Sequence, residues 1–401
     1  MSNRIAEYYD VIVVGGGPAG SVTARFIAEG GYSVLILERD REVGIPVRCA
    51  EGVSHHGIEH FIDINAKWIN TTIEGARLYA PDGSHADMYN NGIGYIVDRR
   101  VFDRELVDIA VSHGAQILTK ADAIGLLYSD NKQISGVRFT YDNSVKEVRC
   151  KIVIGADGIE SKVGRWAGID TSLKLNDVCT CCQYTINNNI QIDKSLIHVY
   201  FGTDIAPGGY LWLFPKSETS ANIGVGISGE LSKPGKGPKY YLDKFISQHF
   251  PKASLSYSVF GGVPTLVGEE FITDGVMLVG DAARQANPIT GGGIAQGMIA
   301  GKFCGETAVK ALKSNNTSTK FLNEYKVRWF DHIGANQRFM YSLKKKFIKW
   351  GDDRFNNICA IVTKIPRDEF SLKRLFQESL KEDPIMLASL ATSFVVSKLK
   401  K

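Results

Sequence analysis

The sequence predicts an α/β protein in which a three-layer domain is interrupted by a β-rich domain and followed by a helical region. Two features predict this arrangement. Three short apolar runs, at residues 11–14, 152–155 and 276–279, each end in a glycine-rich motif, as buried parallel strands do at a ligand-binding edge. Residues 178–228, between the second and third runs, are rich in the β-branched and aromatic residues that favour sheets.

The length of the chain agrees with more than one domain. It has 401 residues, of which 44% are apolar and 22% charged, the composition of an ordinary globular protein. The three apolar runs are expected in one sheet although they lie far apart in the chain, so the first domain is discontinuous. We assign residues 1–65, 95–170 and 268–318 to this domain, residues 66–94 and 171–267 to the β-rich domain, and residues 319–401 to the helical region.

The stretch "YDVIVVGGGPAGSVTARFIAEGGYSVLILERD" predicts a strand, a glycine turn, a helix and a second strand. The first strand is Val11–Val14. The helix is expected from Ala19 to about Glu29, because its apolar residues share one side and Gly30 stops it. These elements form a right-handed βαβ unit, and such a unit belongs to a parallel, Rossmann-like sheet.

The glycines between this strand and helix form the pattern Gly15-x-Gly17-x-x-Gly20. Gly15 permits the tight turn, Gly17 lets the backbone approach a pyrophosphate, and Gly20 lets the helix pack close to the strand. Amides at the start of the helix, near Ala19, supply N–H groups to phosphates. Glu38, at the end of the second strand, is placed to accept both ribose hydroxyls. In this context the pattern indicates dinucleotide binding rather than a plain glycine turn.

The rest of the chain divides into fewer clear elements. Residues from Val53 to about Tyr95 are expected to be irregular, with short strands only. The stretch Asp98–Gly114 predicts an amphipathic helix that precedes the strand at 152–155. Helices are also expected at residues 239–251, at residues 291–312 and beyond about Thr319.

The second and third apolar runs open further motifs. "GADGIESKVGRWAG" contains Asp157, and "GDAARQANPITGGGIAQG" contains Asp281, which would lie where a polyol hydroxyl needs an acceptor. Gly291 to Gly293 then open a helix, whose N-terminal amides, at Gly292, Gly293 and Ile294, could face a ring that becomes anionic on reduction. A mononucleotide does not need these additional motifs, whereas a long cofactor with a ribityl chain and a fused ring does.

Together, the three motifs resemble the para-hydroxybenzoate hydroxylase class of FAD proteins. Their order and spacing both fit that class over most of the chain. The resemblance implies FAD in the fingerprint, "GADG" as the middle motif and "GDAA" as the ribityl motif. It also implies that Arg99 reaches the flavin nucleotide and that the backbone amide of Ala123 meets the adenine.

Two further runs resemble the geranylgeranyl reductase family, and within it the archaeal digeranylgeranylglycerophospholipid reductases. They are "PVRCAEG", with Cys49, Ala50 and Gly52, and "PGGYLWLFP", from Pro207 to Pro215. Ala50 stands where a glycine is common, a change too small to abolish flavin binding. The resemblance implies that the Cys49 loop lies against the flavin and that the enzyme saturates the isoprenoid chains of membrane lipids.

Tyr210, Trp212 and Phe214 stand at every second position, so on a strand they share one face. A polyprenyl chain has no hydrogen-bonding group except at its head. Recognition must therefore come from burial, at roughly 25 cal/mol per Å² of apolar area, and stiff aromatic walls suit that task. With the resemblance these three residues become the substrate wall. Spacing alone leaves a second interpretation, a core strand whose aromatics pack against a helix.

Cys49 also allows two interpretations. A buried cysteine is usually a small apolar filler. If its loop lies against the flavin, Cys49 is a candidate catalytic residue that positions the alkene or donates a proton, because reduction needs a hydride at one carbon and a proton at the other. A thiol is a weak acid, so water and the reduced flavin remain alternative proton sources.

Cys179, Cys181 and Cys182, in "VCTCCQYTI", invite a metal interpretation. A structural zinc needs four ligands at looped spacing. No fourth cysteine or histidine is near in the sequence, and the run alternates like a strand. We therefore expect no metal and no iron–sulfur cluster here.

The charge of the chain is unevenly placed. The net charge of +4 is nearly balanced, so we expect no nucleic-acid binding. From Lys320 to Lys401, however, 17 Lys and Arg outnumber 9 Asp and Glu, which indicates contact with an anionic headgroup or membrane surface, or else a solvated lysine-rich face. The run Leu343–Trp350 allows the same two interpretations.

The location is expected to be cytoplasmic and peripheral to the membrane. Seven cysteines without a paired framework favour a reducing compartment, and the N-terminus does not read as a secretory signal. The uncharged run Pro384–Ser397 is too short to span a bilayer and is expected to be a buried helix, or else a helix lying in the membrane interface.

These observations predict an FAD-dependent reductase of geranylgeranyl chains on an archaeal-type glycerophospholipid. An external donor must reduce the FAD, and ferredoxin, NAD(P)H and a deazaflavin all remain open. Two alternatives also remain: a flavin monooxygenase acting on an apolar substrate, and a non-catalytic flavoprotein that binds lipid or carries electrons. A monooxygenase consumes O2, whereas a reductase works without it.

Overall fold

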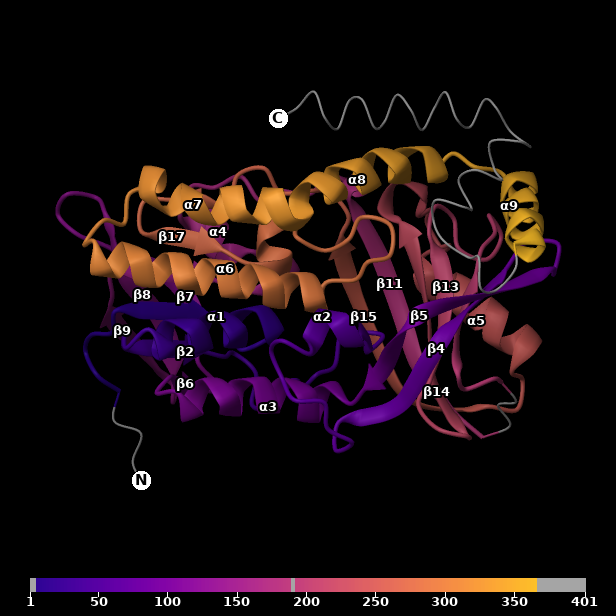
Figure 1. Ribbon diagram of the computed structural model, residues 1–401, viewed down its shortest axis with the longest axis horizontal. Coiled ribbons are helices and arrows are strands. Elements are labelled where there is room, and N and C mark those ends of the chain that lie inside the picture. Colours follow the sequence, from indigo (N-terminus) through magenta and orange to yellow (C-terminus); the bar gives the residue numbers. More distant parts are fainter. Residues whose placement is uncertain (1–4, 189–191, 366–401) are drawn as a thin grey trace.

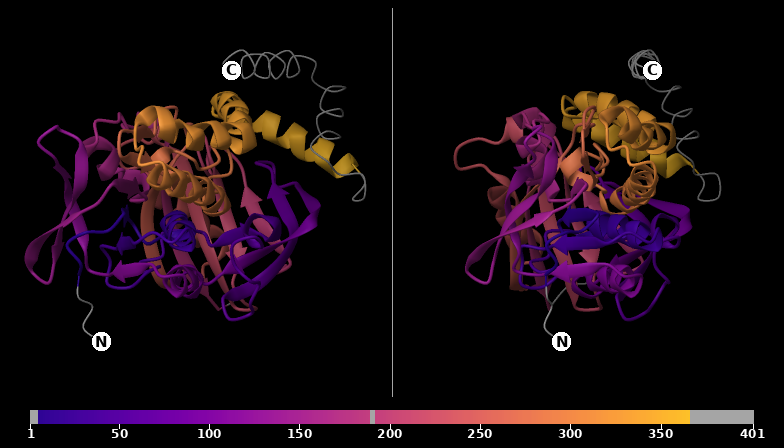
Figure 2. Two further views of the ribbon diagram at one scale, coloured as in Figure 1. Left: turned by 60° about the vertical axis from the view of Figure 1, so that its left-hand side comes forward. Right: turned by 90° about the vertical axis from the view of Figure 1, so that its left-hand side faces the viewer.

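The computed structural model describes residues 5–188 and 192–365, except for the side chains of residues 90–93. Two large sheets follow one another along the long axis of the molecule (Figure 1). Helices α7 and α8 run along the upper side of the molecule in Figure 1, and α6 lies beside α7 (Figures 1 and 2).

The first sheet is formed by the three apolar runs and their neighbours. Its six strands stand in the order β16-β17-β10-β1-β2-β6, and β1 pairs in parallel with both β10 and β2. The prediction that the three runs share one sheet is therefore confirmed. The strands are β1 (Val11–Val14), β2 (Val34–Leu37), β6 (Gln116–Leu118), β10 (Ile152–Gly155), β16 (Ile272–Thr273) and β17 (Val276–Leu278).

Helices and a small sheet cover the two faces of this sheet and make it three-layered. The helices are α1 (Pro18–Glu29), α3 (Arg99–Ser112) and α6 (Ile294–Lys313). The small sheet is β7 (Asp122–Tyr128), β8 (Ile134–Tyr141) and β9 (Ser144–Arg149). Helices α1 and α6 touch closely, because a Cβ at Gly301 would lie 2.7 Å from the Ala19 carbonyl oxygen.

The second sheet has eight strands in the order β15-β11-β14-β13-β12-β4-β5-β3. Helix α5 (Pro238–His249) packs against one face around a core of aliphatic and aromatic residues. The opposite face is the one that bears the candidate site. The strands are β3 (Gly52–Ser54), β4 (Ile69–Tyr79), β5 (His85–Val97), β11 (Val178–Asn187), β12 (Leu196–Tyr200), β13 (Tyr210–Pro215), β14 (Ser220–Ser228) and β15 (Ser254–Pro264).

The expectation of irregular structure from Val53 to Tyr95 is wrong. Strands β4 and β5 are 11 and 13 residues long and pair with each other. Register shifts between Ile69 and Thr71 and between Ile73 and Gly75 interrupt the alternation, and bulges of this kind hide a strand from a search for period two. Because β5 continues to Val97, it crosses the boundary that we placed at residue 95, and the exact domain limits stay a prediction.

The C-terminal region is helical over its described part, as predicted. Its helices are α7 (Thr319–Trp329), α8 (Ala335–Phe347) and α9 (Asp352–Lys364), with a π-helical segment, Phe330–Gly334, between the first two. Two short helices lie elsewhere, α2 (His55–Ile58) and α4 (Lys162–Trp166). The predicted helix at 384–397 lies outside the described residues. In residues 5–188 and 192–365, no helix has both the length and the apolarity needed to cross a bilayer.

Candidate active site

The glycine turn between β1 and α1 has the geometry that its sequence predicts. Gly15 has φ +109°, and a Cβ there would lie 2.3 Å from the Ala156 carbonyl oxygen. A Cβ at Gly20 would lie only 2.0 Å from the Gly15 carbonyl oxygen. Gly17 differs, because no described heavy atom outside its chain neighbours comes within 4 Å of such a Cβ. Two glycines therefore serve packing, and the third faces open space.

Glu38 lies beside this turn at the end of β2. Its carboxylate accepts hydrogen bonds from the backbone N–H of Gly16 and of Asp40, both at 2.8 Å. Burial raises the pKa of Glu38 despite these bonds. Ala121 donates its N–H to the Glu38 carbonyl at 2.8 Å, which brings the start of β7, with the buried Ala123, toward the same edge.

Asp157 and Asp281 follow β10 and β17 at this edge. Asp157 Oδ2 accepts the Val163 N–H at 2.9 Å, whereas its buried Oδ1 has no partner in the described chain. Within residues 5–188 and 192–365, the Asp281 carboxylate accepts no hydrogen bond. A Cβ at Gly293 would lie 3.1 Å from Asp281 Oδ1. Burial raises the pKa of both aspartates. Both aspartates thus follow strands at one edge of the sheet, and Asp157 Oδ1 is a buried acceptor without a partner in the described chain.

Arg99 begins α3 and forms a two-bond ion pair with Asp103. The Arg99 guanidinium donates to the two carboxylate oxygens at 2.5 and 2.6 Å. Burial alone would lower the pKa of Arg99, but the charge of Asp103 and the adjacent Cys49 thiol raise it above its ordinary value. The charge of Arg99 also acts on Asp281. Arg99 therefore lies between the third motif and the cysteine loop.

Gln183, a residue that we did not predict, connects the cysteine loop to the second sheet. Cys49 Sγ accepts the Glu51 N–H at 3.2 Å. The Cys49 carbonyl accepts a hydrogen bond from Gln183 Nε2 at 2.9 Å, and Gln183 Oε1 accepts one from Trp212 Nε1 at 2.9 Å. A strand of the second sheet thus connects the cysteine loop to the aromatic residues of β13.

Glu51 is a second residue that the sequence analysis missed. It is buried, and its φ of +73° lies in the left-handed region. Its Oε2 accepts hydrogen bonds from Lys216 Nζ at 2.5 Å and Asn222 Nδ2 at 2.6 Å, while Oε1 accepts the Arg99 N–H at 3.1 Å. A signal was available for Glu51, which stands inside the "CAEG" run, but none in the sequence pairs it with Lys216 or Asn222.

The three aromatics of β13 lie on the face that meets these loops. Trp212 lies flat over β14, because a Cβ at Gly224 would come within 2.4 Å of its indole ring. Phe214 packs over Gly52, because a Cβ at Gly52 would lie 3.0 Å from the Phe214 ring. The Tyr210 hydroxyl donates to the Thr290 carbonyl in the third motif. The structure therefore brings this predicted wall against both the cysteine loop and the third motif.

The aromatic contacts continue from Tyr210 toward the C-terminal helices. Phe201 stands 6.4 Å from Tyr210 between ring centroids and stacks on Phe355 of α9 at 5.2 Å. Phe355 in turn lies 5.8 Å from Trp350. Together with the 5.9 Å contact between Tyr210 and Trp212, this forms an aromatic path from the cysteine loop to the α8–α9 corner.

The cysteines of β11 divide between the two faces of the sheet. Cys182 is buried in the core under α5. Cys179 and Cys181 share the face of Tyr210, since a Cβ at Gly226 would lie 2.7 and 3.3 Å from their sulfurs and both act electrostatically on Tyr210. The strand that their alternation predicted is confirmed as β11.

Comparison with known proteins agrees with this geometry. A family model described as the geranylgeranyl reductase catalytic domain matches residues 177–263, and one described as an FAD binding domain matches residues 8–208. The digeranylgeranylglycerophospholipid reductase of Methanosarcina acetivorans is 42% identical over 97% of this chain and 97% of its own. The chain belongs to the geranylgeranyl reductase family.

Other geranylgeranyl reductases and their structural neighbours extend this result. The digeranylgeranylglycerophospholipid reductase of Methanosarcina mazei is also 42% identical, with 97% of each chain covered. The crystal structure of a geranylgeranyl bacteriochlorophyll reductase-like protein from Thermoplasma acidophilum superimposes with a TM-score of 0.91 at 34% identity, covering 96% of this chain and 99% of that one. The flavin-dependent brominase Bmp2, at 17% identity, 94% and 98% coverage and a TM-score of 0.71, shows the fold alone. The predicted fold class, family and FAD cofactor are confirmed.

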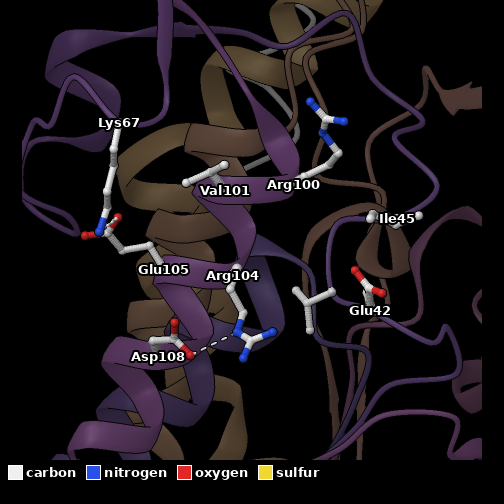
Figure 3. A pocket seen from close by; sticks show the side chains of 9 residues that line it. Glu42, Ile45, Lys67, Arg100, Val101, Arg104, Glu105 and Asp108 are labelled. Atoms are coloured by element: carbon white, nitrogen blue, oxygen red, sulfur yellow. Dashed lines mark hydrogen bonds and ion pairs between the residues drawn. The ribbon is translucent and has the colours of Figure 1, made fainter. Parts of the chain in front are cut away.

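Two pockets of this geranylgeranyl reductase lie away from the site residues. One, of about 320 Å³, lies between the segment from Glu42 to Ile45 and the first turns of α3, and charged side chains of both signs line it (Figure 3). The other, of about 410 Å³, lies beside α5 and is lined by Tyr240 and Phe260. Neither pocket includes a residue of the cysteine loop or of the β13 wall.

Proposed function

We propose that this chain uses FAD to saturate the geranylgeranyl chains of archaeal-type glycerophospholipids. The observation that supports this most is the link from Cys49 through Gln183 to Trp212. It holds an apolar aromatic wall, suited to an isoprenoid, directly beside the loop that the family resemblance assigns to the flavin. The names of the most similar relatives point to the same substrate class.

We also propose which residues hold FAD. Gly17 leaves open space beside the start of α1, as a pyrophosphate requires. The unpaired Asp157 Oδ1 and the Asp281 carboxylate supply acceptors for cofactor hydroxyls. The proposed set is Gly15, Gly17, Ala19, Gly20, Glu38, Cys49, Ala50, Gly52, Arg99, Ala123, Asp157, Asp281, Gly292, Gly293 and Ile294.

The substrate wall is proposed to consist of Tyr210, Trp212 and Phe214. Each ring is held from behind, by a hydrogen bond or by a glycine that leaves no room beneath it. Burying a saturated or unsaturated hydrocarbon against such rings contributes about 0.8 kcal/mol per CH₂. Because the rings are already fixed, little conformational entropy is lost when the chain binds.

Cys49 is proposed to be the catalytic residue of this chain. When bound, reduced FAD supplies the hydride for one alkene carbon. The Cys49 thiol is held by the Glu51 N–H and by its neighbour Arg99, so it stays in place to orient the alkene or to give a proton to the other carbon.

Membrane contact is proposed at the α8–α9 corner. Lys345 and Lys349 are exposed there, which suits an anionic headgroup or membrane surface, and the aromatic path from Trp212 ends at Trp350 nearby. Lys344, from the same run, does not take part, because its Nζ is turned inward to the Asn176 carbonyl at 2.6 Å and Thr265 Oγ1 at 2.5 Å. The external electron donor is proposed to be ferredoxin, NAD(P)H or a deazaflavin.

The experiment is a mass measurement of the lipid with and without oxygen. The reductase proposal expects gains of two hydrogens per double bond in anaerobic mixtures of reduced protein and digeranylgeranyl lipid. Gain of an oxygen atom that depends on O2 would instead support a monooxygenase. Binding of lipid with no change of mass under either condition would support a non-catalytic carrier.

A further inference from the structure

Gln183 occupies a buried position between the two halves of the proposed site. It is 4% exposed and stands in β11 between Cys181 and Thr185. Both ends of its amide are used, since Nε2 donates to the Cys49 carbonyl and Oε1 accepts from Trp212 Nε1, each at 2.9 Å. The amide is thus a single rigid group that spans from the cysteine loop to the wall.

The chemistry of the two partners explains why an amide suits this position. An indole N–H can only donate and a carbonyl oxygen can only accept, so the group between them must accept at one end and donate at the other. An ionised glutamate would keep the bond from Trp212 but would face the Cys49 carbonyl with a second acceptor. A methionine of similar length would make neither bond and would leave two buried polar groups unpaired.

The partners of Gln183 are constrained on their other sides. Trp212 cannot sink toward β14, because Gly224 already lies in contact beneath its ring. The cysteine loop is anchored beyond Cys49 by Glu51, which accepts hydrogen bonds from Lys216 and Asn222. These contacts constrain each partner from one side, and the Gln183 amide connects the two by bonding to both the Cys49 carbonyl and the Trp212 indole.

We propose that Gln183 is a positioning residue that sets the place of Cys49 relative to the Trp212 wall. An isoprenoid lying on the wall then presents its double bond to Cys49 at a fixed distance, which favours reaction. This inference rests on the proposed function, in which the wall holds the substrate and Cys49 lies at the reacting carbons.

The test measures how fast iodoacetamide alkylates Cys49 in the FAD-loaded protein without lipid, followed by peptide mass spectrometry. Q183M breaks both bonds and is expected to raise the rate about fivefold or more, the change that the loss of a bond worth about 1 kcal/mol produces. W212F removes only the indole donor and is also expected to raise the rate. The Q183M/W212F double variant is expected to react no faster than Q183M, because both changes act through one link.

The variants Q183E and Q337E separate the loss of the Gln183 link from the general cost of burying a charge. Gln337 is 1% exposed and its Nε2 donates to the Gln285 carbonyl of the third motif at 2.8 Å, so its bond involves neither the cysteine loop nor the β13 wall. Q183E is expected to raise the alkylation rate of Cys49, and Q337E is expected to leave it unchanged. Equal effects of Q183E and Q337E, additive effects of Q183M and W212F, or no effect of W212F would each overturn the proposal.

Kinetics supply a second readout. Q183M is expected to lower kcat for the prenyl lipid about tenfold, while KM changes less than about twofold, because alignment is lost but the wall remains. A change confined to KM would contradict a positioning role. If the wild-type protein saturates no lipid at all, the proposed function fails, whereas the alkylation rates still decide whether Gln183 couples Trp212 to Cys49.

Discussion

The carboxylate of the buried Glu51 and the ammonium of the partly buried Lys216 form an ion pair at 2.5 Å that joins the cysteine loop to the end of β13. K216M would leave Glu51 charged and buried, with Asn222 as its remaining side-chain donor. We expect a loss of about 3 kcal/mol in the free energy of unfolding, measured as a lower urea midpoint of the FAD-loaded protein. The matched control is K194M, whose pair with Glu218 is exposed and should cost less than about 1 kcal/mol. Equal shifts for the two variants would refute the structural role of the pair between Glu51 and Lys216.

The glycines of the first motif should separate cofactor binding from stability. G17A adds a methyl group where no described atom is near, so we expect an unchanged melting temperature of the FAD-free protein and at least about tenfold weaker FAD binding. G20A places its Cβ 2.0 Å from the Gly15 carbonyl oxygen and is expected to destabilise the fold by about 1–3 kcal/mol. Calorimetric FAD titration and thermal melts measure both. Unchanged FAD affinity in G17A would contradict the proposed pyrophosphate position.

Glu38 should make FAD binding depend on pH. Burial raises its pKa in the free protein, so it takes up a proton at higher pH than an ordinary glutamate does. Ribose hydroxyls that donate to its carboxylate favour the ionised form, so FAD binding lowers this pKa and releases a proton. The affinity is therefore expected to be full above the raised pKa and to fall as the pH drops through it. Fluorescence titrations of FAD over a pH series check this, and an E38Q variant with the same pH profile would rule out Glu38 as the cause.

Gly224 should govern the shape of the substrate wall. In G224A the new Cβ would lie 2.4 Å from the Trp212 ring, so the indole must move off β14 into the space above the sheet. We expect turnover of the geranylgeranyl lipid to fall about tenfold or more while FAD binding is retained. Steady-state kinetics and FAD titration of one preparation measure both quantities. Normal turnover in G224A would show that the face above Trp212 does not hold the chain.

Cys49 should matter for chemistry and not for folding. In C49A we expect FAD binding to be kept and kcat to fall about a hundredfold or more if the thiol gives the proton. Cys150 precedes β10 at the end opposite its glycine motif, and C150A is the control that should keep kcat. A C49A enzyme with normal kcat would leave water or the flavin as the proton source.

Much of the fold was readable from the sequence because its signals are local. The turn at Gly15 to Gly20 needs glycine for reasons of backbone geometry, and the buried strands of the first sheet are unbroken apolar runs. The long strands β4 and β5 were missed because their bulges break the alternation. A local pattern therefore predicts an element only as long as its register stays regular.

The candidate site was predictable in its components but not in its connections. Cys49 and the aromatics of β13 stand in recognisable runs. The residues that join them, Gln183 and Lys216, lie 134 and 165 positions from their partners Cys49 and Glu51. A single sequence carries no signal for such pairs, because nothing in the local pattern of either residue depends on the other.

The central claim is that FAD on this chain reduces geranylgeranyl double bonds. Its most direct test is a single anaerobic turnover in which the flavin and the lipid are both followed. FAD-loaded protein is reduced with dithionite, freed of excess reductant and mixed with digeranylgeranyl glycerophospholipid, while flavin absorbance and lipid mass are followed together. The account predicts that the oxidised flavin spectrum returns as the lipid gains two hydrogens for each FAD reoxidised. Flavin that stays reduced beside lipid of unchanged mass would contradict it.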